Sequence, residues 1–119
     1  MKKFAAAGLI LFLAVGVLFA QQQRFRNGTF TAQGVSYNAA TNAGDGILTA
    51  RVTFRGNRIT EIVVTDATDS PGFLSRVTTV MIPAMLSQNS SEVDIVTGAT
   101  FTSNALKQAV AAAMAEARR

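Results

Sequence analysis

The densest group of side chains able to hold a ligand in this 119-residue sequence lies at residues 94–103, which read DIVTGATFTS. Thr100, Thr102 and Ser103 stand just ahead of an alanine-rich segment with helical spacing. The first turn of a helix offers unpaired N–H groups and the positive end of the helix dipole, which together favour a phosphate. Gly98 would let the backbone approach such a ligand closely. The structural alternative is that Thr102 or Ser103 caps the helix and Gly98 forms a turn.

Composition excludes most other kinds of reactive site. The sequence has no Cys and no His, so it offers no thiol nucleophile, no disulfide, no thiolate or His metal site, and no Ser-His or Cys-His pair. Its seven Asp and Glu residues are scattered and form no strong acid–base pair. Redox or group-transfer chemistry would therefore depend on a bound cofactor.

The charge pattern gives no sign of a nucleic-acid-binding protein. The formal net charge is +4, but Lys2 and Lys3 supply part of it, and the remaining basic residues are spread along the sequence without forming a basic stripe. We therefore expect no nucleic-acid partner. Arg118 and Arg119 end the last predicted helix, where the dipole favours cations, so we expect them to be solvated and not to form a functional basic motif.

The first twenty residues have the pattern of an export signal, because Lys2 and Lys3 precede an uninterrupted apolar run from Phe4 to Ala20. We predict a signal peptide cleaved after Ala20. The run also reaches the lower limit for spanning a bilayer, roughly 17–25 residues, so residues 1–20 could instead be an N-terminal membrane anchor. Either arrangement predicts an extracytoplasmic domain, on the periplasmic or cell-surface side, secreted across the inner membrane or anchored in it. We interpret residues 21–27 as a polar linker and residues 28–119 as one domain.

Strands dominate the first half of the predicted domain. Alternating apolar and polar residues predict strands at 28–37, 47–55 and 58–65, with a possible bulge at Gly34 and a loop at 38–46. The Gly56-Asn57 pair between the last two strands predicts a central hairpin.

Helices dominate the second half. Phe73, Val77, Val80, Met81 and Met85 predict a helix over 73–88, with Pro71 in its first turn and a kink or break at Pro83. A short extended piece at 93–96 precedes an alanine-rich helix over 105–117, whose inner face carries Leu106, Val110, Ala113 and Met114. Strands followed by helices indicate an α+β fold, an antiparallel sheet packed by two main helices.

The pattern D-x-x-T-G-A-T at residues 94–100 resembles the flavinylation motif of the FMN-binding domain family. This domain occurs in flavin-carrying components of the sodium-translocating NADH:quinone oxidoreductase and of the Rnf complex, and in small exported flavoproteins. In that family a flavin transferase joins FMN to the hydroxyl of the motif's last Thr through a phosphoester, outside the cytoplasm. The resemblance implies that Thr100 carries FMN. The other cofactor-binding candidates that it implies in this segment are Asp94, Thr97, Gly98, Ala99, Phe101, Thr102 and Ser103.

Two further stretches are similar to the same family. GTFTAQG from Gly28 resembles its opening strand, and VTFRGNRITEIVV resembles its central hairpin. The family's E-T-P-G loop is approximated by residues 69–72, with Asp69 in place of Glu, and this likeness adds Ser70, Pro71 and Gly72 to the candidates. Phe73 is either a contact of the flavin ring or the first core residue of its helix.

The leading hypothesis is an exported electron-transfer flavoprotein with covalent FMN. Its expected partners are a flavin transferase and a redox donor and acceptor, which could be membrane-bound. We expect an electron carrier or redox subunit more than a stand-alone enzyme, because no dinucleotide-binding Gly-rich loop is evident. The alternatives are a module that binds flavin or another phosphate ligand without a covalent bond, and an interaction module without cofactor.

Overall fold

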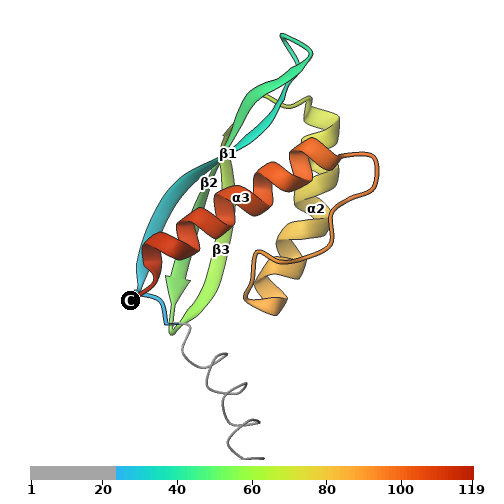
Figure 1. Cartoon of the computed structure of the whole chain (residues 1–119). Coiled ribbons are helices and arrows are strands. Elements are labelled where there is room, and N and C mark those ends of the chain that lie inside the picture. The colour runs from blue at the N-terminus through green and yellow to red at the C-terminus, as the bar shows by residue number, and fades with distance from the viewer. Residues whose placement is uncertain (1–23) are drawn as a thin grey trace, which may run out of the picture.

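Alternating apolar and polar residues build a three-stranded antiparallel sheet in the order β1-β2-β3 (Figure 1). In the computed structural model, which describes residues 24–119, the strands are β1 (Gly28–Asn38), β2 (Ala43–Arg55) and β3 (Arg58–Ala67). The predicted signal peptide or anchor at 1–20 lies outside the described residues. On β2, the side chains of Leu48, Ala50, Val52 and Phe54 are all fully buried, so one face of the strand forms part of the core.

The predicted central hairpin is confirmed. Arg55 pairs with Arg58 across a two-residue turn. Both turn residues have a positive φ, +59° at Gly56 and +70° at Asn57, which is the backbone geometry of a primed turn that matches the twist of the strands.

The prediction of a loop at 38–46 is wrong for most of that segment. Ser36 pairs with Gly46 and Asn38 with Ala43, so the two strands continue and residues 39–42 form the turn. Short polar side chains hold this turn, because the Oδ1 of Asn38 accepts a hydrogen bond from the backbone N–H of Ala40 at 2.9 Å. Strand propensity is low for such residues, so the pairing is set by the neighbouring strand.

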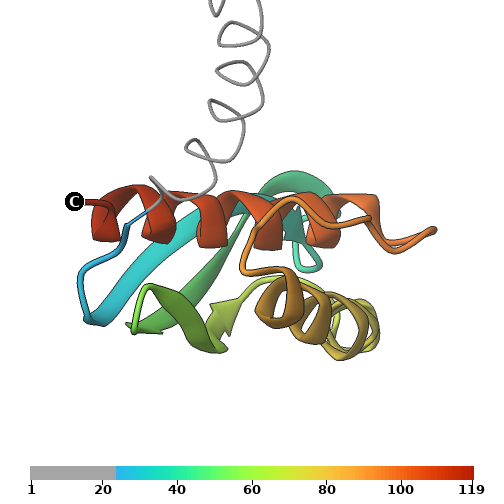
Figure 2. The same ribbon diagram turned by 90° about the horizontal axis from the view of Figure 1, so that it is seen from below.

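The two helices cover different strands. Helix α3 (Thr100–Ala117) crosses β1 and β2, while α2 (Pro71–Gln88) lies along β3 (Figures 1 and 2).

The predicted bulge at Gly34 is wrong, because Gly34 pairs in register with Leu48 and the irregularity lies between Ser36 and Asn38. Gly34 instead allows close helix packing, since a Cβ there would lie 2.1 Å from the carbonyl oxygen of Ala105.

Helix α2 begins at Pro71, two residues before the predicted range of 73–88, and runs through Pro83 to Gln88 as one helix. Of the two outcomes expected at Pro83, a kink or a break, the break is therefore wrong. Pro83 is exposed, as is Thr79 one turn earlier, so water can satisfy the carbonyl that loses its helical N–H donor. Val77, Met81 and Met85 form the buried face.

Helix α3 starts at Thr100, five residues before the predicted start at 105. Its predicted inner face is confirmed, because Leu106, Val110, Ala113 and Met114 are all buried. The connection before it, including the predicted extended piece at 93–96, pairs with no strand of the described chain. The two helices and the antiparallel sheet confirm the α+β fold.

The described chain begins inside the folded unit. The sequence predicts a linker over 21–27, but Phe25 is only 1% exposed and its ring centroid lies 4.8 Å from that of Phe54. Phe25 also forms an isolated bridge with Arg118, so residues 24–27 pack on the domain. No helix within residues 24–119 is long and apolar enough to cross a membrane.

Candidate functional site

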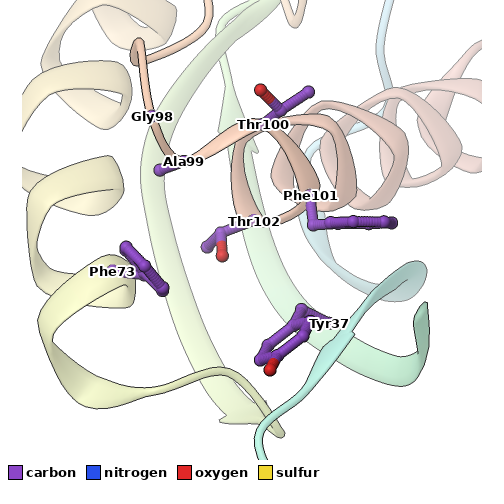
Figure 3. A pocket seen from close by; sticks show the side chains of 7 residues that line it. All are labelled: Tyr37, Phe73, Gly98, Ala99, Thr100, Phe101 and Thr102. Atoms are coloured by element: carbon purple, nitrogen blue, oxygen red, sulfur yellow. The ribbon is translucent and has the colours of Figure 1, made fainter. Parts of the chain in front are cut away.

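A pocket of about 320 Å³ opens where α3 begins (Figure 3). It brings together one residue of β1, one of α2 and the last part of the D-x-x-T-G-A-T segment. The residues that line it are Tyr37, Phe73, Gly98, Ala99, Thr100, Phe101 and Thr102. Its volume lies near the lower end of the range for small-molecule sites.

The backbone of the pocket is shaped by Gly98 and the start of α3. Gly98 has φ +88°, a conformation that residues with a Cβ rarely adopt. The helix begins after Ala99, and no side chain caps it. The N–H groups of its first turn, those of Thr100, Phe101 and Thr102, are therefore available to an anion.

Thr100 is the first residue of α3, and its side chain is exposed. In Figure 3 this side chain points away from the rings of Tyr37 and Phe73. Its hydroxyl is thus at the rim of the pocket and accessible from solvent. An exposed hydroxyl beside free N–H groups suits a phosphate bound at the helix start.

Three aromatic rings surround the space below the helix start. Tyr37 comes from β1, Phe73 from the first turn of α2, and Phe101 from α3 (Figure 3). The ring centroids of Tyr37 and Phe101 are 6.2 Å apart. Phe73 is 39% exposed and Phe101 57% exposed, although apolar rings of this size are usually buried. They offer apolar surface to a flat, aromatic ligand.

Beneath the pocket, a buried hydrogen-bond network joins three segments. The Oδ2 of Asp69 accepts hydrogen bonds from the hydroxyls of Ser36 and Thr102, each at 2.5 Å. All three residues are buried, with Asp69 only 7% exposed. Its second carboxylate oxygen, Oδ1, is buried without a partner among the residues that the structure describes.

The capping roles predicted for Thr102 and Ser103 are wrong. Both residues lie inside the first turns of α3 and are buried, and Ala99 occupies the cap position. The hydroxyl of Thr102 donates to Asp69, and that of Ser103 accepts from the backbone N–H of Val96 at 3.0 Å. These hydroxyls therefore fasten the helix start to neighbouring loops.

A second, adjoining pocket of about 300 Å³ is lined by Ser70, Gly72, Phe73 and Arg76. Phe73 is shared by the two pockets. The guanidinium Nη2 of Arg76 donates to the carbonyl of Thr97 at 3.1 Å, and the same nitrogen lies 3.8 Å from where a Cβ of Gly98 would be. A positive charge thus lies beside the turn that leads into α3.

The structure brings most of the predicted site residues to these two pockets. Gly98, Ala99, Thr100, Phe101 and Thr102 line the first, and Ser70 and Gly72 line the second. The remaining candidates, Asp94, Thr97, Ser103 and Pro71, do not line either.

Sequence reasoning missed Tyr37 and Arg76 as parts of the site. Tyr37 is the only Tyr of the sequence and ends a predicted strand. No signal in the neighbouring residues indicated that it would lie beside α3. Arg76 lies one helical turn after Gly72, so its position on the face of Ser70 and Gly72 could have been inferred from the helix period.

Together the fold and the site define a small α+β domain whose ligand pocket lies at the start of a helix. The chain belongs to the FMN-binding domain family, because the family model for the FMN-binding domain matches residues 45–115. The matched region contains every residue of the two pockets except Tyr37. A search of curated proteins found no matching relative.

The described residues fit a flavin nucleotide as ligand. A flavin has a flat aromatic ring system and, in FMN, a terminal phosphate. The aromatic side chains of the first pocket suit the ring, and the uncapped helix start beside Arg76 suits the phosphate.

Proposed function

We propose that this protein is an exported electron-transfer flavoprotein whose FMN is attached through its phosphate to the hydroxyl of Thr100. The observation that carries the proposal is the position of Thr100, which ends the D-x-x-T-G-A-T pattern and exposes its side chain at the uncapped start of α3. Export is supported by the lysine-headed apolar run at the beginning of the sequence.

The residues around Thr100 would hold the phosphate. The N–H groups of the first turn of α3 would donate hydrogen bonds to its oxygens. The guanidinium of Arg76, already held beside Gly98 by the carbonyl of Thr97, would balance its negative charge. A covalent bond here would retain the cofactor in a compartment without free FMN.

Tyr37, Phe73 and Phe101 would contact the flavin ring and shield it from water. When bound, FMN supplies reversible uptake of one or two electrons. The chain's own contribution is to position the ring and to set the polarity around it, which tunes the reduction potential. The described residues include no His and no Cys, so these side chains act by contact and charge.

Attachment needs a separate enzyme. Forming the ester replaces the O–H bond of Thr100 by an O–P bond, so the flavin phosphate must come from an activated donor. The leaving group departs with the electrons of the broken P–O bond, and the hydroxyl proton passes to a base. We therefore expect a flavin transferase to supply both the activated donor and the base.

The test is to express the wild type, Thr100→Ala and Thr100→Ser with an active flavin transferase and to look for fluorescence after denaturing electrophoresis. We expect a fluorescent band from the wild type and from Thr100→Ser, and none from Thr100→Ala. Thr79→Ala, which removes an exposed Thr of α2 outside both pockets, is the matched control and should remain fluorescent. Circular dichroism should be alike in all four proteins, because each substitution changes only one exposed side chain.

A denatured Thr100→Ala protein that still fluoresced would contradict attachment at Thr100. A wild type that lost its flavin on denaturation, while binding it in the native state, would favour the non-covalent module. A wild type that bound no flavin at all would favour an interaction module.

A further inference from the structure

One end of the domain carries six exposed arginines, which we call the basic pole: Arg24, Arg26, Arg55, Arg58, Arg118 and Arg119. These are six of the nine Lys and Arg residues that follow the leader. In the sequence they are spread over nearly a hundred positions. The fold therefore creates a concentration of charge that the sequence does not show, in which Arg118 and Arg119 join four other arginines instead of standing as an isolated pair at a helix end.

Three chain segments meet to form the basic pole. The backbone N–H of Arg119 donates to the carbonyl of Arg24 at 3.0 Å, and that of Arg26 donates to Ala117 at 2.8 Å. The turn between β2 and β3 joins them, because the backbone N–H of Gly56 donates to the Oδ1 of Asn27 at 3.1 Å. Figures 1 and 2 both show the beginning of the described chain, this turn and the C-terminus at the same end.

The charge of the basic pole is not neutralised by carboxylates of the folded unit. Within residues 24–119 the ion pair is that of Lys107 with Glu92, and neither residue belongs to the pole. Glu116 is its acidic neighbour, but Arg26 bonds to the backbone carbonyl of Glu116. Arg58 likewise donates to a backbone carbonyl, that of Leu86, at 3.2 Å. Backbone contacts thus fix two guanidinium groups while leaving their charge uncompensated.

The flavin pocket lies at the opposite end of α3. This helix has 18 residues, so at 1.5 Å per residue about 27 Å separates Thr100 from the basic pole. The pocket end carries charges of both signs, with Arg76 beside Gly98, Asp69 beneath the pocket and Asp45 next to Gly44. Basic residues therefore outnumber acidic residues at the basic pole but not at the pocket end.

We propose that the basic pole binds the anionic phospholipid headgroups of a membrane surface. The apolar run at residues 4–20 ends four residues before Arg24, so the pole is the part of the domain where the leader sequence joins. Guanidinium groups pair well with phosphate oxygens, and basic residues next to a membrane-directed segment are attracted to anionic lipid. Docking in this way turns the pocket away from the bilayer, toward partners in the aqueous compartment. This surface is separate from the pocket and needs no bound flavin.

A lipid surface explains the pole better than a nucleic acid does. Single-stranded nucleic acids are held by aromatic rings on which bases stack, but Phe25 is buried and Arg26 covers the ring of Phe30 at 5.3 Å from its centroid. Reading a DNA duplex needs a helix or strand that can enter its major groove. The segments of the basic pole pair with one another instead.

The absence of Cys from the sequence allows a site-specific test on the protein as the host exports it. One fluorophore is attached at Ala115→Cys, exposed near the pole, or at Ala40→Cys, exposed in the turn between β1 and β2. Energy transfer to a lipid-bound acceptor is then measured on vesicles of phosphatidylcholine alone or mixed equally with phosphatidylglycerol. Anionic vesicles should raise transfer from the Ala115 site far more than from the Ala40 site, and high salt should abolish the increase.

Charge variants complete the test, because each basic residue near an anionic surface raises partitioning roughly fivefold. The double variant Arg55→Gln with Arg119→Gln should therefore need more anionic lipid for half-maximal transfer, by at least about tenfold. The control variant, Arg51→Gln with Lys107→Gln, removes the same charge outside the pole. It should change the amount of anionic lipid needed for half-maximal transfer by no more than about twofold.

Three results would overturn the proposal. Equal transfer on neutral and anionic vesicles would show that the pole does not recognise lipid charge. Equal loss in the two double variants would show that net charge alone is sensed. Tighter binding to duplex DNA than to anionic vesicles, with the same Arg55 and Arg119 dependence, would assign the pole to nucleic acid.

Discussion

Thr102, in the first turn of α3, donates a hydrogen bond to Asp69, in the loop before α2, with 2.5 Å between Oγ1 and Oδ2. The two residues are 33 positions apart and both are buried. Their bond joins the segment that presents Thr100 to the segment that presents Ser70 and Gly72. The relative position of the two pockets therefore depends on a polar contact beneath them.

We expect Asp69→Ala to lower the free energy of unfolding by about 2–4 kcal/mol, because it leaves the buried hydroxyls of Ser36 and Thr102 without their acceptor. Asp69→Asn retains an oxygen that can accept both bonds and should cost about 1 kcal/mol. Urea denaturation measures both values. Asp66→Ala, an exposed carboxylate nearby in β3, is the control and should change stability by about 0.5 kcal/mol or less. Equal losses in Asp69→Ala and Asp66→Ala would show that the network contributes nothing.

Much of the fold is predictable because its signals are local. The alternation in β2 and the Gly-Asn turn define the central hairpin within one short stretch. The period of Val77, Met81 and Met85 defines the buried face of α2. The cluster around Gly98 and Thr100 is also predictable from local chemistry, since a helix start and a glycine turn are adjacent in the sequence.

The rest depends on contacts between distant segments. Thr102 and Ser103 have the residue types of helix caps, and only the packing of α3 against Asp69 and Val96 shows that they are interior residues. The start of β2 at residues 43–46 has small and polar side chains, so its pairing follows from β1 and not from its own propensity. The basic pole likewise exists only once the chain ends and the hairpin turn meet.

Gly34 provides a second test of packing. Because a Cβ at this position would lie 2.1 Å from the carbonyl oxygen of Ala105, Gly34→Ala must push α3 away from β1. We expect the free energy of unfolding to fall by about 2–3 kcal/mol. Thermal and urea unfolding should both report the loss. Gly72→Ala is a matched control, since a Cβ there meets nothing within 4 Å and alanine favours the helix, so its stability should be unchanged or slightly higher. A Gly34→Ala protein as stable as Gly72→Ala would mean that α3 is not held this tightly against the sheet.

Arg76 should distinguish FMN from riboflavin, because the two ligands share the flavin ring and differ in the phosphate. The measurement uses Thr100→Ala, in which no ester can form at that residue, and compares the affinity for each ligand by quenching of flavin fluorescence. Arg76 is exposed, so its charge should contribute no more than about 1 kcal/mol. Adding Arg76→Gln should therefore weaken FMN binding about three- to fivefold and leave riboflavin binding unchanged. Arg51→Gln removes an exposed charge from the sheet outside both pockets. It should change neither the affinity for FMN nor the affinity for riboflavin. If Arg76→Gln weakened both ligands equally, Arg76 would act only by holding the carbonyl of Thr97, and the phosphate would depend on the N–H groups of α3 alone.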